Sequence, residues 1–372
     1  MRPAPSVHAV ALAGAMIACS DSASTSPDLC IADCSPGPGG APYPRSPVVA
    51  GITFDFSTHR REAPGSDNWP ITWADDGHQY AVWGDGGGFG GTNDEGRVSL
   101  GVARIEGPAS SYTGFNVYGG KDAPNGAVFG GKSNGILSID GTLYMWVGPG
   151  SNTRAFTQAR LHRSTDHAAS WTAADWAFTD DDGIILPTFA QFGRDYAGAR
   201  DGFVYAYAMH LKDPDAFEVQ RPGEIALMRV PRDRVMERDA YTFFAGLDGA
   251  GSPLWTSVLT ARRPVFEDPN GVGPKTSVSF NAGLGRYFLI TAHTEFLRGR
   301  IGIFDAPEPW GPWTTVRYDG VFGDSKLEDT RTFFWNFSNK WASADGRNVL
   351  LLFTGPGRND SWNTVEGRIE LR

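Results

Sequence analysis

The sequence predicts an all-β protein, a five-bladed β-propeller, and two observations carry this prediction. First, a strand, a tight Gly turn and a second strand that opens on an aromatic or β-branched residue recur five times along the 372 residues. The repeated turns contain Gly77, Gly141, Gly202, Gly285 and Gly346. Second, 47 Gly, 25 Pro and 12% aromatic residues suit many short strands, and long helical patterns are missing. Radial repetition hides the edges of such β-units, so each repeat is interpreted as one blade.

Each blade is expected to supply three strands around its Gly turn, because Asp-Gly between apolar runs favours a hairpin turn with positive φ. The expected strands are 69–73, 79–83 and 98–105 in the first blade; 135–139, 143–147 and 158–164 in the second; 197–199 or slightly earlier, 203–209 and 225–230 in the third; 277–281, 287–292 and 301–304 in the fourth; and 338–342, 349–353 and 364–371 in the fifth. Residues 48–56 also alternate. They are expected to form the outer strand of the last blade, which would close the ring by joining both chain ends.

The N-terminus predicts export. Arg2 precedes an apolar segment, residues 9–18, that is too short to span a bilayer as a stable helix. Residues 16–19 resemble a bacterial lipobox, so residues 1–19 are interpreted as a signal peptide that ends with lipidation of Cys19. Ordinary secretion with cleavage nearby is the alternative. The protein is therefore expected either as a lipoprotein of the outer membrane or cell surface, or as a secreted protein.

Residues 20–46 are rich in Ser, Pro, Gly and Asp, which predicts a flexible tether before the propeller domain, residues 47–372. Cys30 and Cys34 lie in this tether, where an oxidising compartment favours a small disulfide loop. The net charge of −9 provides no basic surface for nucleic acid and disfavours docking on an anionic membrane. We expect a monomer that contacts the membrane only through its lipid. No cofactor is expected to be required, and a structural Ca²⁺ in the central channel is the one ion that the prediction allows.

Functional residues are expected on one face of the propeller. The first strand of each blade lines the channel and the Gly turns share one face, so the opposite face collects the starts of first strands and the ends of second strands. Counting back from each turn Gly gives a strongly polar rim. Aromatic rings stack on sugar faces, while amides and charged groups bind hydroxyls, so the rim suits a sugar polymer. The expected substrate-binding residues are Asn68, Trp69, Lys132, Asn134, Arg194, His210, Lys275, His293 and Asn336.

Carboxylates of this face are the candidate catalytic groups, because glycoside hydrolysis needs one protonated acid and one ionised base or nucleophile. Asp67 and Asp195 come from non-adjacent blades and are expected to face one another across the channel. Asp85 and Glu224 are further candidates. The alternative for each acid is a structural role, in which it caps a turn or pairs with a basic neighbour.

A polysaccharide lyase that cleaves uronates by β-elimination is the second hypothesis. That chemistry needs a cation to neutralise the carboxylate and a His or Tyr to move protons, and Lys132, Arg194, Tyr207 and His210 could supply the set. His210 and His293 are alternatively polar ends of apolar strands, or ligands of a channel ion. A glycan-binding protein without catalysis is the third hypothesis.

Several segments carry a family resemblance. Residues 67–77, followed by Trp-Gly-Asp-Gly at 83–86, resemble the opening of a group of secreted bacterial β-propellers that is labelled as a domain of unknown function. Further similar segments are 132–141, 227–231 with 241–246, and 302–313, so the resemblance covers roughly residues 50–372. Some members of that group are endo-acting glycoside hydrolases that cut D-arabinan, and five-bladed arabinanase-type enzymes are a more distant likeness. The resemblance therefore implies a hydrolase of an arabinan-like glycan.

Ulvan-lyase-type propellers contain a phrase similar to residues 196–205. Those lyases use His, Tyr and Arg, whereas here Asn134 lies where an early His is expected and Glu224 lies where the Arg is expected. This departure disfavours the lyase. The expected function is cleavage of glycosidic bonds by two carboxylates.

Overall fold

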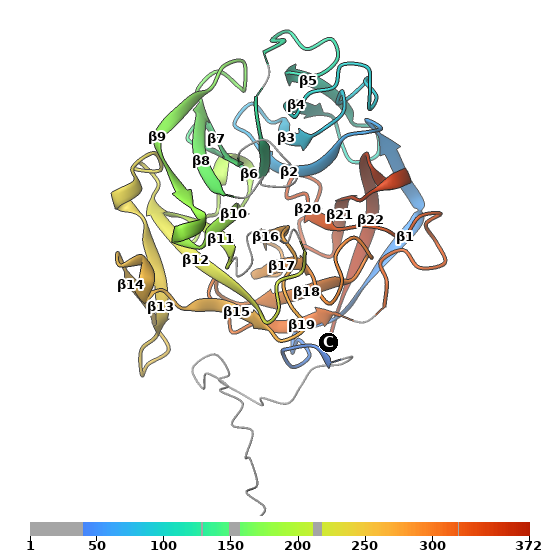
Figure 1. Ribbon diagram of the computed structural model, residues 1–372. Coiled ribbons are helices and arrows are strands. Elements are labelled where there is room, and N and C mark those ends of the chain that lie inside the picture. Colours follow the sequence, from blue (N-terminus) through green and yellow to red (C-terminus); the bar gives the residue numbers. More distant parts are fainter. Residues whose placement is uncertain (1–39, 128, 149–156, 211–217, 319) are drawn as a thin grey trace, which may run out of the picture.

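The computed structural model describes residues 40–127, 129–148, 157–210, 218–318 and 320–372. Within these ranges the fold is all-β: strands β1 to β22 are joined by loops and short 3₁₀ turns, without an α-helix, and no helix there is able to cross a membrane. The sheets curl around a common centre (Figure 1). The predicted all-β, propeller-like fold is confirmed. The 3₁₀ turns are Asp180–Asp182, Arg194–Tyr196, Arg238–Ala240, Leu259–Ala261 and Gly357–Asn359.

The first two sheets are four-stranded antiparallel meanders in chain order. The first contains β2 (Asp67–Trp73), β3 (Gln79–Gly84), β4 (Leu100–Glu106) and β5 (Thr113–Tyr118). The second contains β6 (Lys132–Ile139), β7 (Thr142–Gly148), β8 (Gln158–Ser164) and β9 (Thr172–Thr179).

The next two groups of strands are joined into one sheet of ten strands. One group contains β10 (Ile184–Gln191), β11 (Phe203–His210), β12 (Gly223–Pro231), β13 (Thr242–Leu247) and β14 (Pro253–Thr256), with β15 (Pro264–Asp268) paired to β12. The other contains β16 (Thr276–Asn281), β17 (Arg286–Ala292), β18 (Ile301–Ala306) and β19 (Thr314–Arg317). A short parallel pairing of β10 with β16 joins the two groups.

The last sheet contains residues from both ends of the described chain. Its strands are β20 (Phe334–Phe337), β21 (Asn348–Thr354), β22 (Trp362–Leu371) and β1 (Val49–Glu62). β1 pairs antiparallel with β22 from Val49 opposite Leu371 to Glu62 opposite Trp362. Trp362 also packs edge-on against Trp69 of β2, with ring centroids 5.2 Å apart, and such ring pairs contribute about 0.5–1.5 kcal/mol beyond burial. The first and last sheets are therefore in direct contact.

The inner strands pack closely around the centre. β2, β6, β10, β16 and β20 lie nearest the middle of the ribbon (Figure 1), and every residue of β6 is buried. Gly135 of β6 shows how close the packing is: a Cβ there would lie 2.9 Å from the carbonyl oxygen of Pro187 on β10. Only glycine permits this approach.

The hairpin turns gather at one end of the inner strands. Gly77, Gly141, Gly285 and Gly346 have φ values of 83°, 70°, 62° and 72°, as the Asp-Gly and similar signals predict. Asn281 in turn donates to the carbonyl oxygen of Gly346 at 2.8 Å, so neighbouring turns are bonded to each other. We call this end the turn end. The opposite end, where β2, β6 and β16 begin, is the start end.

Two expected inner strands are displaced in the structure. The third is β10, which ends at Gln191, whereas 197–199 or slightly earlier was expected. Phe192 and Tyr196 are buried against each other, with ring centroids 4.8 Å apart, and they hold the intervening chain as a loop. The fifth is β20, which ends at Phe337, whereas 338–342 was expected. In both cases the distance from the inner strand to the turn differs from that in the other repeats.

Candidate active site

A β-bulge at the start of β2 sets the direction of its first side chains. Asp67 pairs with Gly84 of β3, but the register shifts between Asn68 and Ile71. Asn68 and Trp69 have φ values of 78° and 53°, which residues other than glycine rarely adopt. Bulges and strained backbone gather at functional sites because they redirect side chains. Here the bulge buries Trp69 in the core and leaves Asp67 at the start of the strand.

Asp67 is a half-buried acid with a buried, unsatisfied oxygen. Its Oδ1 atom is shielded from solvent and accepts no hydrogen bond from the described residues. A Cβ on Gly84 would lie 3.1 Å from this oxygen, so the carboxyl packs directly on the glycine backbone. Burial raises the pKa of Asp67 to about 7, against the opposing charges of Lys275 and Lys132. Asp67 therefore keeps its proton far above the pH at which an exposed Asp loses it.

Asp85, directly after β3, is the second acid of the start end. It forms ion pairs with Lys132 and, at 3.2 Å, with Arg97. The Lys132 side chain is only 8% exposed, and its Nζ atom also donates to the carbonyl oxygen of Ser99 at 3.1 Å. Charge-assisted contacts with two cations require an ionised carboxylate. Asp85 is thus the ionised acid of this end.

The two acids are neighbours. The point where a Gly84 Cβ would stand lies 3.1 Å from Asp67 Oδ1 and 3.0 Å from the Cδ atom of Lys132. Gly84 precedes Asp85 in the chain, and the Lys132 ammonium binds the Asp85 carboxylate. The Gly84 backbone is therefore the floor on which an acid, a carboxylate and a lysine meet.

Lys275, just before β16, adds a second buried cation. It is 3% exposed and donates to Asn134 Oδ1 from the start of β6. Burial lowers the pKa of Lys275, while the charge of Asp67 opposes this shift. Of the expected residues, the structure thus brings together Asp67, Asp85, Lys132, Asn134 and Lys275. A protonated acid beside an ionised carboxylate is the division of roles that acid–base catalysis requires.

Sequence reasoning missed two groups at this end. Arg97 precedes β4 and binds Asp85. Asp360 follows β21, and burial together with the charge of Asp85 raises its pKa. Because β21 is the second strand of the fifth repeat, counting forward from Gly346 to the end of that strand would have reached the loop that holds Asp360.

His210 and Glu224 are also brought together, in a separate place. His210 ends β11 and Glu224 lies at the start of β12, with Nδ1 and Oε2 3.0 Å apart. Their backbone neighbours belong to β10 and β15 rather than to β2 or β6. Both residues lie at the start end, but the structure gives no contact between them and Asp67.

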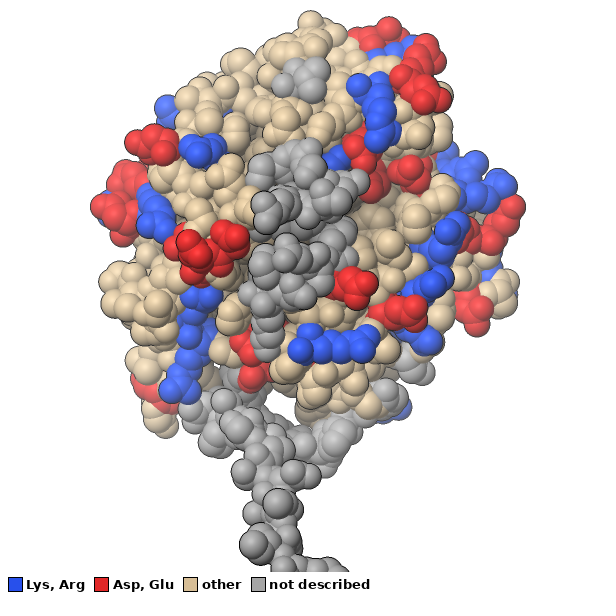
Figure 2. All heavy atoms as spheres, viewed as in Figure 1, with Lys and Arg blue, Asp and Glu red and all other residues tan. Residues whose placement is uncertain are grey.

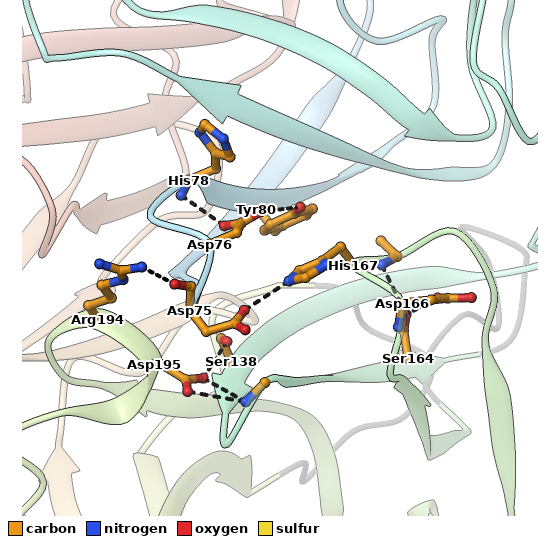
Figure 3. A network of polar contacts seen from close by, with 12 residues as sticks. Asp75, Asp76, His78, Tyr80, Ser138, Ser164, Asp166, His167, Arg194 and Asp195 are labelled. Carbon is orange, nitrogen blue, oxygen red and sulfur yellow. Dashed lines mark hydrogen bonds and ion pairs between the residues drawn. The ribbon is translucent and has the colours of Figure 1, made fainter.

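Asp195 lies at the turn end, so the predicted pairing of Asp67 with Asp195 is wrong (Figure 3). Its Oδ1 atom accepts from Ser138 Oγ at 2.8 Å, and both carboxylate oxygens accept from the backbone nitrogen of Gly141. Gly141 is in the β6–β7 turn, whereas Asp67 starts β2. The two acids are separated by the length of an inner strand, about 20 Å.

Arg194 is displaced for the same reason. It donates to the carbonyl oxygen of Asp75 in the β2–β3 turn, also at the turn end (Figure 3). Counting back from Gly202 reached the loop after β10, because that strand already ends at Gln191. The start of β10 is instead Ile184.

Several expected sugar-binding residues are occupied by contacts within the protein. Trp69 has no exposed surface and packs among other Trp rings, so it offers no face to a sugar. His293 stacks on Tyr318 with ring centroids 3.7 Å apart, and both of its ring nitrogens are bonded. Asn336 lies within β20 and donates to the Trp69 carbonyl oxygen at 3.4 Å. Asn68 is buried in the bulge.

Some predictions lie outside the described residues. The signal peptide, lipidation of Cys19, the tether and the Cys30–Cys34 loop all fall before residue 40, apart from the end of the tether. Among the described residues, the group of acids and His close enough to share a metal ion is Asp75, Asp76 and His167, at the turn end and not in the channel. The channel Ca²⁺ stays a prediction.

Three solved structures are similar to most of the chain, each with a TM-score below 0.5. A GH43_1 enzyme from Xanthomonas citri is 15% identical, with 82% of this chain and 87% of that chain covered and a TM-score of 0.47. The catalytic domain of the GH62 α-L-arabinofuranosidase from Coprinopsis cinerea is 11% identical, with 87% and 95% covered and a TM-score of 0.44. The α-L-arabinofuranosidase Arb93A from Fusarium graminearum is 9% identical, with 88% and 98% covered and a TM-score of 0.44.

No curated protein matches the sequence. Residues 133–348, more than half of the chain, match the family described as "Domain of unknown function (DUF4185)". The matched range contains Asn134 and Lys275 but begins after Asp67 and Asp85. The chain therefore belongs to the DUF4185 family.

Proposed function

We propose that this protein hydrolyses glycosidic bonds of a polysaccharide, with Asp67 as the proton donor and Asp85 as the ionised partner. One observation carries the proposal: the buried, unsatisfied Asp67 oxygen packs on Gly84, and the next residue in the chain, Asp85, forms ion pairs with two cations. The structural alternative would leave an unpaired buried polar atom with nothing to offset its cost, about 1–3 kcal/mol.

The chemistry follows from the two protonation states. Asp67 gives its proton to the glycosidic oxygen as the bond to the anomeric carbon breaks. Asp85 then acts in one of two ways. It takes a proton from a water that attacks the anomeric carbon, or its carboxylate attacks the anomeric carbon directly. Lys132 and Arg97 position the Asp85 carboxylate, and they stabilise its charge until the sugar carries positive charge.

The finer architecture belongs to the same proposal. We take the five groups of strands as five blades, closed into a ring by β1 on the sheet of β22. The pairing of β1 with β22 and the packing of Trp69 on Trp362 support this interpretation. An arabinan-like glycan is the proposed substrate class, and the chain is proposed to act as an exported monomer tethered through Cys19, without a cofactor.

The lyase is the weaker alternative because its residues are not assembled. Arg194 is at the turn end, and the Tyr207 hydroxyl is buried and donates to the carbonyl oxygen of Pro309 at 2.7 Å. Neither residue is therefore available beside Lys132 or His210 in the described structure.

Product analysis tests the proposal. The purified protein is incubated with a panel of arabinans, uronans and other cell-wall glycans, and both reducing ends and near-ultraviolet absorbance are followed. New reducing ends without absorbance are expected. Absorbance from an unsaturated product would support the lyase, and retention of a polymer without cleavage would support glycan binding alone.

A further inference from the structure

A pocket opens at the start end, around the His210–Glu224 pair. It has a volume of about 370 Å³, in the range of cavities that hold small ligands. Its polar wall includes the 3₁₀ turn Asp180–Asp182, His210, Glu224 and Arg262. Its apolar wall is formed by Leu259, Pro264 and Ala226.

The pair fixes the orientation of the imidazole. Glu224 Oε2 lies 3.0 Å from His210 Nδ1, so Nδ1 donates to the carboxylate. The Nε2 atom has no hydrogen-bond partner among the described residues. It lies 3.5 Å from the point where a Cβ of Gly183 would stand, and Gly183 lines the pocket. The side chain is 39% exposed, so Nε2 is accessible to a ligand.

The charges of the pocket select against anions. Asp182 is already paired with Arg238, and Glu224 holds His210. Asp180 and Asp181 remain as exposed carboxylates.

Arg262 is the positively charged residue that lines the pocket together with these carboxylates. It is half-buried and donates to the carbonyl oxygens of Leu259 and Gly183. Excess carboxylate repels a uronate, while carboxylate, guanidinium and imidazole groups all bind neutral hydroxyls well. The apolar wall suits the C–H face of a sugar ring.

The pocket lies at the same end of the inner strands as the proposed catalytic acids, on neighbouring strands. β10 pairs in parallel with β16, with Ala190 opposite Val278. His210 pairs with Ile184, six residues before Ala190, whereas Lys275 precedes Val278 by three. A β-bulge between Ile185 and Thr188 takes up one residue of β10, so His210 lies two residues, about 7 Å, further along the strand direction than Lys275.

We infer that the His210–Glu224–Arg262 pocket is a distal subsite that binds a neutral sugar unit of the glycan. This inference rests on the proposed function for its substrate class. The pocket is assigned a role in binding and not in proton transfer to the scissile bond. Loss of the subsite is therefore expected to weaken the binding of long substrates only.

The test measures binding in a chain that cannot turn over its substrate. Full-length Asp67→Asn protein is titrated calorimetrically with short and long arabinan oligosaccharides, and by affinity electrophoresis with arabinan and polygalacturonate. Adding His210→Ala, or the exposed change Asp181→Asn, is expected to weaken the binding of long arabinan oligosaccharides at least fivefold and leave short ones within twofold. Asp239→Asn, an exposed acid outside the pocket, is the matched control.

The outcomes separate the subsite from the proposed function. Unchanged affinity in both variants, tighter binding of polygalacturonate than of arabinan, or no binding of arabinan by the Asp67→Asn chain would each overturn the subsite. A length-dependent loss of affinity in a protein whose unmodified form does not cleave arabinan would support the subsite and contradict the hydrolase. Thermal unfolding of each variant shows that a loss of affinity does not come from misfolding.

Discussion

The two ends of the inner strands use the same residue types in opposite ways. At the turn end, Asp195 accepts hydrogen bonds from Ser138 and Gly141, and Asp75 pairs with His167 at 2.9 Å (Figure 3). At the start end, Asp67 Oδ1 is buried without a partner among the described residues. At the turn end the carboxylates of Asp195 and Asp75 are bonded to other residues and stabilise the loops. At the start end one carboxyl oxygen, Asp67 Oδ1, has no such bond among the described residues.

The comparison shows that the hydrogen bonding of the carboxyl oxygens, rather than the residue type, separates structural acids from candidate reactive ones. A carboxylate that accepts backbone N–H groups is stabilised in its ionised form and unavailable for acid–base work. Charge alone does not mark the difference, because acidic and basic side chains are interspersed over the coloured surface that Figure 2 shows. Four predictions test this contrast.

The largest effect is expected from Asp67→Asn and Asp85→Asn. Each change removes one of the two proposed catalytic carboxyls, so hydrolysis of the polysaccharide is expected to fall by about 10²–10⁴-fold. Asp67→Asn keeps the shape of the side chain and removes a half-buried ionisable group, so the melting temperature is expected to change little. Rates of reducing-end release and thermal unfolding measure both quantities.

The matched control for these variants is Asp195→Asn at the turn end. It is expected to cleave the substrate within about twofold of the unmodified rate, since Asp195 accepts hydrogen bonds from Ser138, near the end of β6, and from Gly141 of the turn, both at the turn end. Normal cleavage by Asp67→Asn would contradict the site at the start end.

Gly84→Ala is expected to give the next largest effect. Its Cβ would lie 2.7 Å from Asn68 Nδ2, 3.0 Å from Lys132 Cδ and 3.1 Å from Asp67 Oδ1. The clash displaces the acid and the lysine together, so activity is expected to fall by about 10- to 100-fold. Overpacking is expected to lower the free energy of unfolding by about 1–3 kcal/mol.

Gly202→Ala provides the comparison for Gly84→Ala, because no atom lies within 4 Å of its Cβ position and its φ is not positive. It is expected to leave both activity and stability unchanged. Equal activity in the two variants would show that Asp67 and Lys132 do not need the geometry set by Gly84.

At the turn end, Asp195→Ala is expected to affect stability and not catalysis. The change removes the acceptor of the Ser138 hydroxyl and of the Gly141 backbone N–H. The expected loss is about 1–3 kcal/mol in the free energy of unfolding, measured by urea denaturation. A stable variant without activity would instead reinstate Asp195 as a catalytic residue.

The sequence predicted the fold better than the site, for a physical reason. Hairpin signals are largely local: Asp140 and Gly141 form a positive-φ turn, and this turn was predicted correctly, whereas the same signal at Asp201 and Gly202 gives no positive φ. The start of an inner strand is not local, because it depends on where the chain leaves the core. Packing of Phe192 and Tyr196 moved the third inner strand, and with it the position assigned to Asp195.

Within the site, a residue was placed correctly when it lies at the end of a regular strand, and was misplaced or missed when it lies in a bulge or a longer loop. Asp67, Asp85 and Lys132 lie at the end of the strands where they were expected, because β2, β3 and β6 keep the expected distance to their turns. Trp69 was assigned to sugar stacking because the bulge that turns its ring into the core has no clear sequence signal. Asp360 was missed because its loop follows the second strand of the repeat by several residues.

The smallest expected effect is a shift in pH dependence, and it distinguishes the roles of the two acids. Burial raises the pKa of Asp67 to about 7, so a proton donor at this position loses its proton as the pH rises through that value, and hydrolysis is expected to decline there. The charge of Lys275 lowers this pKa, so Lys275→Met is expected to move the decline to higher pH.

The free energy of unfolding is expected to decrease with rising pH, as the activity does, between the ordinary pKa of Asp67 and its raised pKa of about 7. The folded chain binds the Asp67 proton more tightly than the unfolded chain, whose pKa is the ordinary 3.8, so the contribution of Asp67 is complete below that value and is lost as the pH rises through about 7. Burial also raises the pKa of Asp268, to about 6, and this group changes the stability in the same direction. Asp67→Asn is therefore expected to remove only part of the pH dependence of the free energy of unfolding. Urea unfolding at several pH values measures it. An activity that instead rises through pH 7 would make Asp67 the base, and the start end would then need its donor elsewhere, with Asp360 as the nearest raised acid.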